Sequence, residues 1–400
     1  MNRICVLKNP IQHYAWGSHT AIPELLGQAA TSETPQAELW MGAHPEAPSE
    51  VLVDGNWYPL LELIEKRPAE ILGKRVAEKF GGNLPFLFKV LAAARPLSIQ
   101  AHPNLDQARE GFARENSLRI PLVASNRNYK DSNHKPEAIC ALTPFWALNG
   151  FRKITDMVSI LKLVNAAELS EEVTDLEARP DSDGLKRFFS IIMTMKQSRQ
   201  RRVLEAAIAC ADKRAAEDVL FEWMLKLHAQ YPGDVGVLSP ILLNVVTLNP
   251  GEAMFLRPGQ LHVYLEGMGI ELMANSDNVL RGGLTRKHVD VPELLRILDY
   301  GEREIAILIP EERGEAERVY PSVADEFQLS VIAVTDGISY ESPKNRSVEI
   351  IICTAGNASV KTVGKDETLE LSSGSSIFIP AAVQKYCIAG EATLYKASVP

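Results

Sequence analysis

The order of strand-like and helical stretches is the feature that most limits what this chain can fold into. Over residues 1–152, short apolar runs are broken by Gly, Pro and Asn, a texture typical of β-strands. Over residues 153–232, apolar side chains recur at positions i, i+3, i+4 and i+7, the spacing of amphipathic helices. Strand texture returns over 245–256 and continues from 327 to 400. The sequence therefore predicts a mainly β protein with an α-helical insertion.

Two shorter helices are expected inside the strand-rich regions. The stretch from Leu60 to Phe80 has spaced apolar residues among Glu, Lys and Arg, and Pro68 marks a break near its middle. Another helical stretch lies around Pro292 to Leu298. Apart from the broken helix, we expect the first 152 residues to form strands and turns. The apolar run from Phe86 to Leu97 suggests a buried pair of strands.

One pattern occurs twice. The segments Gly251–His262 and Gly374–Lys385 each contain a turn glycine, a short apolar strand, a Pro turn and a closing polar residue. This hairpin resembles the second motif of cupins, which are small β-barrels of jelly-roll type. In that motif the closing residue is a metal-binding histidine, and here it is His262 in the first copy and Lys385 in the second. We therefore expect two barrels, of which the C-terminal one has no metal.

These patterns predict three domains, in keeping with 400 residues at roughly 150 per domain. Residues 1–152 and 233–320 would form a discontinuous cupin domain that contains the catalytic site. Residues 153–232 would form the helical insertion. Residues 321–400 would form the second, cupin-like barrel.

Charge and cysteine content limit the partners and the compartment. The net charge of −9, from 51 acidic and 42 basic residues, argues against a nucleic-acid or anionic membrane surface, so an anionic ligand needs a local basic pocket. Five scattered cysteines without a short spacing argue against disulfides and cysteine-bound zinc. The N-terminus is too polar for a signal peptide, and the longest apolar run, 235–248, is too short to cross a bilayer. We expect a cytoplasmic monomer that acts on a small molecule, without nucleic acid or membrane partners.

Gln100 and His102 are the first candidate ligands of a metal ion. Residues two apart on a strand point to the same face, and Ser98 shares that face. Inside a barrel such a pair could bind one ion, because a buried polar side chain needs a partner. A hydrogen-bonded or exposed pair is the more common explanation of this spacing when it stands alone.

A second candidate group follows at residues 133–137. His134, Lys135 and Glu137 crowd the start of an apolar strand, where Pro136 indicates an edge or a barrel mouth. Glu137 is either a further ligand or a surface acid. With His262, the set offers two imidazoles, one carboxylate and one amide oxygen, which suits zinc, although iron or manganese is also chemically acceptable. The remaining histidines have no matching partner and are expected to be structural or on the surface; they are His13, His19, His44, His228 and His288.

The stretch from Gly269 to Lys287 combines acids, bases and glycines. Glu271 and Asp277 precede Arg281, whose planar guanidinium suits oxygen anions. The glycines after Arg281 allow the backbone to bend closely around a ligand. The alternative is a capped turn followed by a solvated basic face.

Six motifs occur in order over residues 12 to about 290. They are Gln12–Ser18, Glu38–Pro45, Leu97–Pro103, His134–Glu137, Pro258–His262 and Glu271–Thr285. Together they resemble the type I mannose-6-phosphate isomerases, or phosphomannose isomerases, of the cupin superfamily. The resemblance implies a cupin catalytic domain with a helical insertion and a C-terminal β-barrel.

The resemblance also implies an activity and its residues. One zinc ion would be held by Gln100, His102, Glu137 and His262. Arg281 would be catalytic, and the polar groups around the reacting carbons would be Glu271, Lys135, His134 and Asp277. The phosphate would be bound by Lys89, Ser98, Lys135 and Arg281. The reaction would interconvert mannose 6-phosphate and fructose 6-phosphate, either supplying GDP-mannose synthesis or feeding mannose into glycolysis.

The implied isomerisation explains why the site would need a metal ion and an acid–base group. The proton moves between C1 and C2 through a cis-enediol, so negative charge develops on oxygen and a Lewis acid and a base are needed. The base is left open between Glu271 and a His134/Asp277 group, because the pKa of each depends on its surroundings. Two other functions are considered: a metal-dependent cupin dioxygenase, and a binding module that has kept only the sugar-phosphate pocket. The flanking basic residues favour a phosphorylated substrate over an apolar one.

Overall fold

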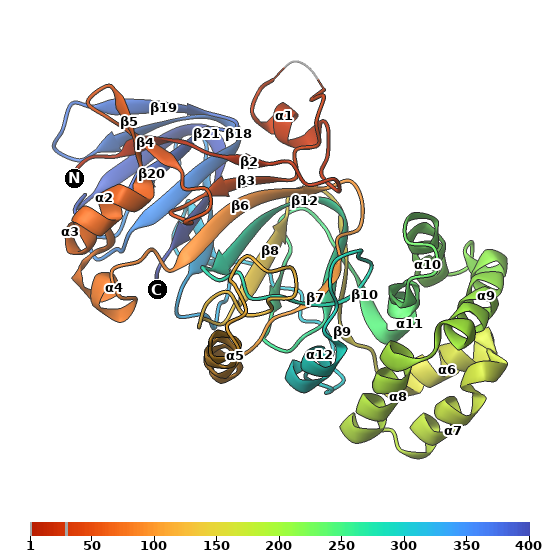
Figure 1. Ribbon diagram of the computed structural model, residues 1–400. Coiled ribbons are helices and arrows are strands. Elements are labelled where there is room, and N and C mark those ends of the chain that lie inside the picture. Colours follow the sequence, from red (N-terminus) through yellow and green to blue (C-terminus); the bar gives the residue numbers. More distant parts are fainter. Residues whose placement is uncertain (1, 29–30) are drawn as a thin grey trace.

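The protein consists of two large antiparallel sheets with a helical domain at one end (Figure 1). The structure is a computed structural model that describes residues 2–28 and 31–400. In Figure 1 the helical domain extends to the right, away from both sheets, and the N- and C-terminal ends lie on the opposite side. The predicted mainly β fold with a helical insertion is confirmed.

The first sheet has ten strands in the described part of the chain. They are β2 (Ile11–Gln12), β3 (Glu38–Met41), β6 (Phe86–Ala93), β7 (Ile99–Ala101), β8 (Glu137–Ala141), β9 (Phe145–Phe151), β10 (Leu243–Leu248), β11 (Ala253–Leu256), β12 (His262–Ala274) and β13 (Leu280–Gly283). The main path runs β10-β9-β12-β6-β3-β2, with the other four strands paired beside it. β12 pairs with β6, β7, β8 and β9, so this strand is the centre of the sheet.

The second sheet has eleven described strands. They are β1 (Cys5–Lys8), β4 (Glu50–Val53), β5 (Asn56–Pro59), β14 (Glu311–Glu312), β15 (Glu317–Val319), β16 (Gln328–Val334), β17 (Tyr340–Glu341), β18 (Glu349–Thr362), β19 (Thr368–Ser372), β20 (Ser376–Ile379) and β21 (Tyr386–Ser398). The order is β14-β15-β16-β21-β18-β20-β1-β4-β5, with β17 on β21 and β19 on β18. Strands from the N-terminal region are thus part of the C-terminal sheet.

This topology departs from the expected division of the chain in two places. β1, β4 and β5 lie within residues 1–152, yet they extend the C-terminal sheet through the pairing of Cys5 with Phe378. β14 and β15 join the same sheet before residue 321. One apolar core then contacts both sheets, because it contains Phe88 of β6 as well as Ile350 of β18. Sequence patterns do not show strand partners, and the pairing of β1 with β20 joins segments hundreds of residues apart.

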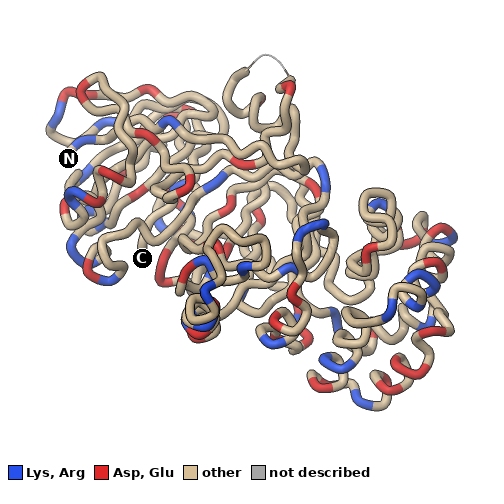
Figure 2. Tube along the Cα trace, in the orientation of Figure 1, with Lys and Arg blue, Asp and Glu red and all other residues tan. Residues whose placement is uncertain are grey.

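The helical domain is formed by five longer helices, α6 (Ile154–Val164), α7 (Ser170–Ala178), α8 (Ser182–Thr194), α9 (Gln197–Arg214) and α10 (Val219–Gln230). Asp181 caps α8 by accepting a 2.7 Å hydrogen bond from the backbone N–H of Gly184. The apolar faces bury residues such as Phe188 and Met224 in a core shared with the first sheet. Basic and acidic residues are both spread along these helices (Figure 2).

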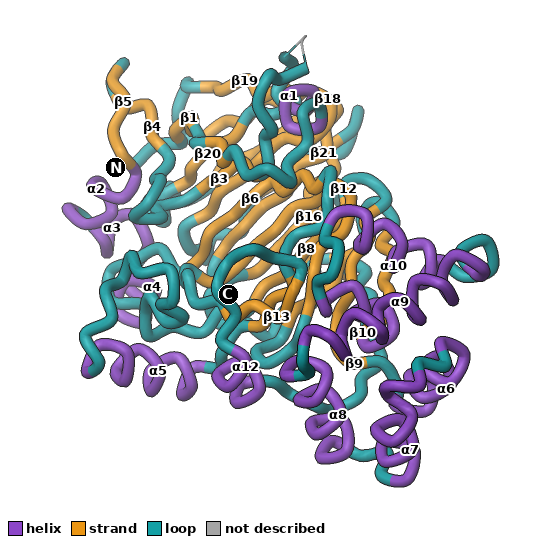
Figure 3. The backbone as a smooth tube through the Cα atoms, turned by 45° about the vertical axis from the view of Figure 1, so that its right-hand side comes forward, coloured by secondary structure: helices purple, strands orange, loops and turns teal. Residues whose placement is uncertain are grey.

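The remaining helices cover the sheets (Figure 3). They are α1 (Ala21–Leu25), α2 (Leu60–Lys66), α3 (Pro68–Leu72), α4 (Lys74–Lys79), α5 (Leu105–Ser117), α11 (Ser239–Leu242) and α12 (Val291–Ile297). The broken helix expected over residues 60–80 is observed as α2, α3 and α4, and the short helix near Pro292 as α12.

Three expectations for the first 152 residues were wrong. α1 and α5 are helices where only strands and turns were expected, and α5 begins with a capping box that joins Asn104 and Gln107. That Asn-x-x-Gln signal was readable in the sequence. The run from Phe86 to Leu97 is not a strand pair, because β6 ends at Ala93 and a turn follows.

The repeated hairpin is observed in both sheets. Gly251 and Gly374 both have positive φ values, 88° and 83°, and each precedes a short buried strand, β11 or β20. β12 then begins at His262, whereas Lys385 precedes β21 and forms an exposed 2.7 Å ion pair with Glu341. Glycine suits this turn because it adopts positive φ without steric cost.

In the described part of the chain, none of the helices combines the length and the apolar character that a membrane crossing requires. Cys5, Cys140 and Cys353 are buried, whereas Cys210 and Cys387 are partly exposed.

Candidate active site and metal centre

The strand register brings distant polar residues to one place in the first sheet. His262, the first residue of β12, lies opposite Gln100 of β7. Arg281 of β13 lies opposite Gln100 on the other side of β7. Glu137 begins β8, which also pairs with β12. The sheet therefore positions side chains whose sequence numbers differ by more than 180.

Three buried side chains converge as metal ligands would. The Nε2 atoms of His102 and His262 lie 3.5 Å from Oε1 and Oε2 of Glu137, respectively. One ligand atom of each residue lies within 4.8 Å of the others. The three residues are at most 4% exposed. Because water is excluded, such polar groups require another partner.

Backbone hydrogen bonds hold both imidazoles in the tautomer that can bind a metal ion through Nε2. Nδ1 of His102 lies 2.7 Å from the carbonyl oxygen of Asn278, and Nδ1 of His262 lies 3.0 Å from that of Gln260. Since a carbonyl only accepts, each Nδ1 must be the protonated nitrogen, and each Nε2 keeps its lone pair. Nε2 of His102 is buried and has no hydrogen-bond partner among the described residues. A cation between these atoms would satisfy all of them.

The local electrostatics favour the same protonation states. Burial lowers the pKa of His102 to about 4, so its ring is neutral near pH 7. Burial alone would raise the pKa of Glu137, but the ammonium of Lys135, 3.0 Å from its Oε1, lowers it well below its ordinary value. The side-chain Nε2 of Gln100 donates to Ser98 Oγ at 3.2 Å, which leaves the Gln100 Oε1 free. Two neutral imidazoles, one carboxylate and one amide oxygen fit zinc.

A cavity of about 60 Å³ lies beside these residues. It is lined by Glu38, Lys89, Leu91, Leu97, Ser98, Gln100, Lys135, Glu137, His262, Val263, Tyr264 and Glu271. This volume holds a few water-sized groups but not a whole hexose phosphate, so such a ligand would extend out of the cavity. The expected residues Lys89, Ser98, Lys135 and Glu271 therefore lie together with three of the four expected ligands, Gln100, Glu137 and His262.

Lys89 is a buried cation between two carboxylates. Its Nζ lies 2.9 Å from Glu271 Oε2 and 3.6 Å from Glu38 Oε2. The ring of Trp40 lies 5.4 Å from the same Nζ, and Trp40 Nε1 donates to Glu38 at 2.6 Å. Glu38 and Trp40 were not among the predicted site residues. They lie in the Glu38–Pro45 motif, which was a signal that could have identified them.

Two other predicted basic residues, Lys135 and Arg281, differ in their partners. Lys135 Nζ lies 3.0 Å from Glu137 Oε1 and is mostly buried. Arg281 is half-buried and forms no hydrogen bond or ion pair among the described residues. Burial lowers the pKa of its guanidinium, which nevertheless stays charged. Arg281 is therefore available for an anionic ligand, whereas Lys135 is partly neutralised.

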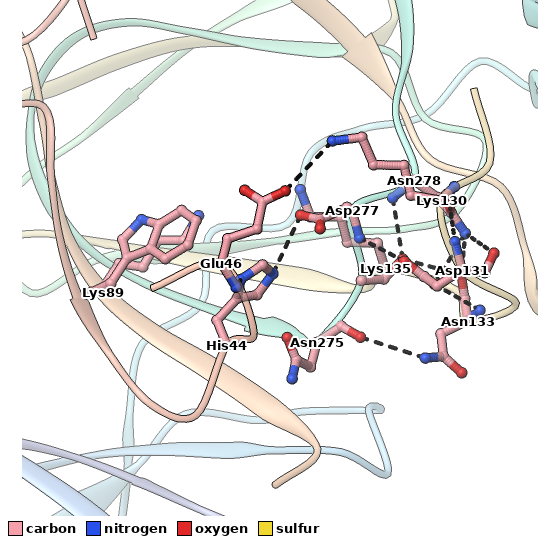
Figure 4. Close-up of polar contacts among 12 residues, drawn as sticks. His44, Glu46, Lys89, Lys130, Asp131, Asn133, Lys135, Asn275, Asp277 and Asn278 are labelled. Carbon is pink, nitrogen blue, oxygen red and sulfur yellow. Dashed lines mark hydrogen bonds and ion pairs between the residues drawn. The ribbon is translucent and has the colours of Figure 1, made fainter. Parts of the chain in front are cut away.

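His134 and Asp277 do not pair with each other. His134 Nε2 lies 2.7 Å from Glu326 Oε1, in the segment that leads to β16. Asp277 Oδ1 lies 3.4 Å from Nε2 of His44, which is buried (Figure 4). A single proton-transfer group made of His134 and Asp277 is therefore not present. His44 was expected to be structural or on the surface; it is buried and in contact with Asp277.

The loop between β12 and β13 is held by a network around Asp131 and Asn278 (Figure 4). Asp131 Oδ2 accepts the backbone N–H of Asp277 at 2.8 Å, and Asn278 Nδ2 donates to the carbonyl of Asp131 at 2.9 Å. Asn278 Oδ1 accepts the N–H of Lys130 at 2.7 Å. These bonds fix the carbonyl of Asn278 that contacts His102.

Family models match most of the chain. The catalytic domain of type I phosphomannose isomerase matches residues 4–154. Its helical insertion domain matches residues 160–243. The cupin domain of mannose-6-phosphate isomerase matches residues 316–399.

Relatives and solved structures agree with these matches. A mannose-6-phosphate isomerase from Escherichia coli K12 is 42% identical, with 97% of each chain covered. The human mannose-6-phosphate isomerase is 33% identical, covering 95% of this chain and 94% of its own. A crystal structure of zinc-bound mannose 6-phosphate isomerase is 40% identical, with a TM-score of 0.92 over 99% of both chains.

Proposed function

The chain belongs to the type I phosphomannose isomerase family, and from that premise we propose that it interconverts mannose 6-phosphate and fructose 6-phosphate with one zinc ion. The observation that supports this most directly is the buried group of His102, Glu137 and His262, with both imidazole lone pairs directed at one carboxylate. The family match favours this reaction over a cupin dioxygenase or a binding module.

We propose that Gln100, His102, Glu137 and His262 bind the zinc ion. Oε1 of Gln100 is the free oxygen of its amide, and the other three atoms already face one another. When bound, zinc supplies a Lewis acid that polarises a carbonyl or lowers the pKa of a neighbouring hydroxyl without redox change. The C-terminal sheet contributes no ligand to this set.

Glu271 is the best-placed group to move the proton between C1 and C2. It lines the cavity beside Gln100, Glu137 and His262, whereas His134 and Asp277 are not among the lining residues and contact Glu326 and His44 instead. Burial raises the pKa of Glu271 above its ordinary value, which suits a carboxyl group that must both accept and return a proton. His134 and Asp277 then help to enclose the sugar and exclude water, and the reaction passes through a cis-enediol.

Arg281 has two roles in this proposal. Its unpaired guanidinium, opposite Gln100 in the sheet, stabilises negative charge that develops on the enediol oxygens or holds the sugar chain. With Ser98, Lys135 and Lys89 it also provides the groups that meet the phosphate. Lys89 already neutralises two carboxylates, so we expect it to contribute less to binding a dianion than Arg281.

Several broader properties belong to the same proposal. We propose that the protein is a cytoplasmic monomer and that it supplies mannose 6-phosphate for GDP-mannose or feeds mannose into glycolysis. The sheet topology supports a catalytic unit of residues 11–49, 84–151 and 239–300 around the first sheet. The helical insertion at 153–232 and the cupin-like C-terminal unit complete the chain, the latter with β1, β4 and β5 added to it.

A coupled assay of mannose 6-phosphate conversion tests this function. The purified protein is assayed as isolated, after chelation, and after zinc is added back. We expect activity to disappear with zinc and to return with it. A folded, zinc-loaded protein that does not produce fructose 6-phosphate would contradict the proposal.

A further inference from the structure

A second polar pocket, of about 490 Å³, lies between the α3–α4 junction and the C-terminal sheet. Six basic residues line it, namely Lys74, Arg75, Arg313, Lys344, Arg346 and Lys396. Glu349 is the one acidic side chain among the described residues that line it. The pocket shares no lining residue with the cavity beside Glu137. In Figure 2 basic residues gather at α4, next to the C-terminal end. Such a concentration is unexpected in a chain with a net charge of −9.

The floor of this basic pocket contains two cations that are neutralised internally. Lys396 Nζ lies 2.6 Å from Glu317 Oε1 and donates to Tyr340 Oη at 2.7 Å. Arg346 Nη1 donates to Glu349 Oε2 at 3.0 Å. The Arg346 side chain is only 2% exposed, yet its Nε has no hydrogen-bond partner among the described residues. A buried N–H without a partner is costly, so an acceptor is expected here.

The rim of the pocket contains cations that have no close carboxylate. Arg313 Nη1 donates to the neutral amide of Gln328 at 3.1 Å. Lys344 also lines the pocket and has no ion-pair partner in the described chain. On the facing wall, Lys74 has only a 3.9 Å surface contact with Glu78. The C-terminal carboxylate of Pro400 also lines the pocket and accepts a hydrogen bond from Arg75, so Arg75 is neutralised as well. The cations that keep their charge available to a ligand are Arg313 and Lys344 on one wall and Lys74 on the other.

We propose that this basic pocket binds a small organic molecule with two or more phosphate groups. Arginine and lysine side chains on opposite walls can each meet one phosphate, with the guanidinium of Arg313 as a bidentate donor. The volume lies within the usual range of small-molecule sites. In an acidic protein, a local positive potential selects anions and concentrates them at this one place. The proposal does not depend on the isomerase reaction, because none of its residues lines the active site.

Calorimetric titration with 2,3-bisphosphoglycerate tests the proposal. The variant Arg313→Ala/Lys344→Ala removes two rim cations and leaves two structural arginines unchanged: Arg75, which donates to Pro400, and Arg346, which donates to the carbonyls of Pro380 and Val383. The control Arg201→Ala/Lys213→Ala removes the same charge from the exposed surface of α9. We expect one bisphosphate per chain in the unmodified protein, binding roughly tenfold weaker in the pocket variant, and unchanged binding in the control. Isomerase activity should be the same in all three.

The remaining outcomes would overturn the proposal. No binding to the unmodified protein, or equal affinity in all three proteins, would show that the pocket holds no such ligand. If both double variants lose the same amount of bisphosphate affinity, the loss comes from the change in net charge and not from the pocket. If 2,3-bisphosphoglycerate competes with the isomerase substrate, and its inhibition constant is the same in the pocket variant, the bisphosphate binds at the active site and not in the basic pocket. If the alanine variant unfolds at a lower temperature than the unmodified protein, the Arg313→Gln/Lys344→Gln variant provides the same test and retains more of the side-chain packing.

Discussion

Lys89 and Glu271 lie directly opposite each other on β6 and β12, and their side chains form a 2.9 Å ion pair inside the first sheet. Both residues are almost fully buried, and Glu38 adds a second carboxylate at 3.6 Å from the same ammonium. Buried charges of this kind are stable only when each has an oppositely charged partner beside it. Lys89, Glu271 and Glu38 line the active-site cavity and lie on paired strands of the first sheet.

Removal of Lys89 is therefore expected to reduce stability strongly. Lys89→Ala leaves two buried acids without their cation, which costs roughly 3–5 kcal/mol. Urea unfolding measures this change. The control is Lys8→Ala, which breaks an exposed 2.8 Å pair with Glu50 and should cost about 0–1 kcal/mol. Equal effects of the two substitutions would show that the buried pair has no special importance.

Loss of a zinc ligand should remove metal and activity together. In His262→Ala the carboxylate of Glu137 keeps only one imidazole neighbour, so zinc affinity should fall by more than the roughly 10–100-fold that loss of an outer hydrogen-bond partner causes. Gln100→Ala should act in the same direction. Metal analysis and the coupled assay are the two measurements, with the exposed His288→Ala as control. Full activity without metal in His262→Ala would refute the ligand set.

Arg281 should matter for turnover and not for zinc. Arg281→Ala removes the one half-buried guanidinium opposite Gln100, and kcat should fall by roughly 100- to 1,000-fold with zinc content unchanged. Arg286→Ala, an exposed neighbour, serves as the matched control. If Arg281→Ala turns over substrate normally while correctly folded, its catalytic role is wrong.

The loop that orients His102 should tune zinc affinity from outside the ligand set. Asn278→Ala removes the side-chain bonds to Lys130 and Asp131 and frees the carbonyl that holds Nδ1 of His102. Zinc should then bind roughly 10–100-fold more weakly, as followed by competition with a chelator. Asn275→Ala, in the same loop, should change affinity little. Identical affinities in the two variants would mean that the network does not position the ligand.

Glu293 is expected to contribute to stability only above acidic pH. Although burial opposes its ionisation, hydrogen bonds from Arg296, Tyr129 and Arg114 lower the pKa of Glu293 from 4.5 to about 2. A lowered folded-state pKa gives stability that is complete above pH 4.5 and is lost as the pH falls towards 2. The stability difference between the unmodified protein and Glu293→Gln should therefore shrink between pH 5 and 2.5 in urea unfolding. A difference that is constant with pH would contradict this linkage.

Local patterns predicted many of these elements because their physics is local. The apolar spacing of residues 153–232 produces helices with one buried face, and the two-residue spacing of Gln100 and His102 places both on one face of β7 and its continuation. Positive φ at Gly251 and Gly374 follows from the turn glycines. The capping box at Asn104 belongs to the same class of signal and was overlooked.

Residue chemistry also indicated the donor set of the metal site, whereas its surroundings were not foreseen. Glu38 and Trp40 contact Lys89, and His44 contacts Asp277. These contacts were not predicted because each of the three residues lies far from its partner in the sequence. Burial and partner identity set the charge of such groups, and neither property belongs to a single segment.

The sequence by itself determined the mainly β architecture, the helical insertion, the hairpin repeat and the candidate ligands Gln100, His102, Glu137 and His262. Only the tertiary structure decided that β1, β4 and β5 complete the C-terminal sheet, that His134 and Asp277 have separate partners, and that Arg281 is unpaired. The reason is physical. Turn and helix preferences act over a few residues, but strand pairing and ion pairing act between segments that meet only when the whole chain has folded.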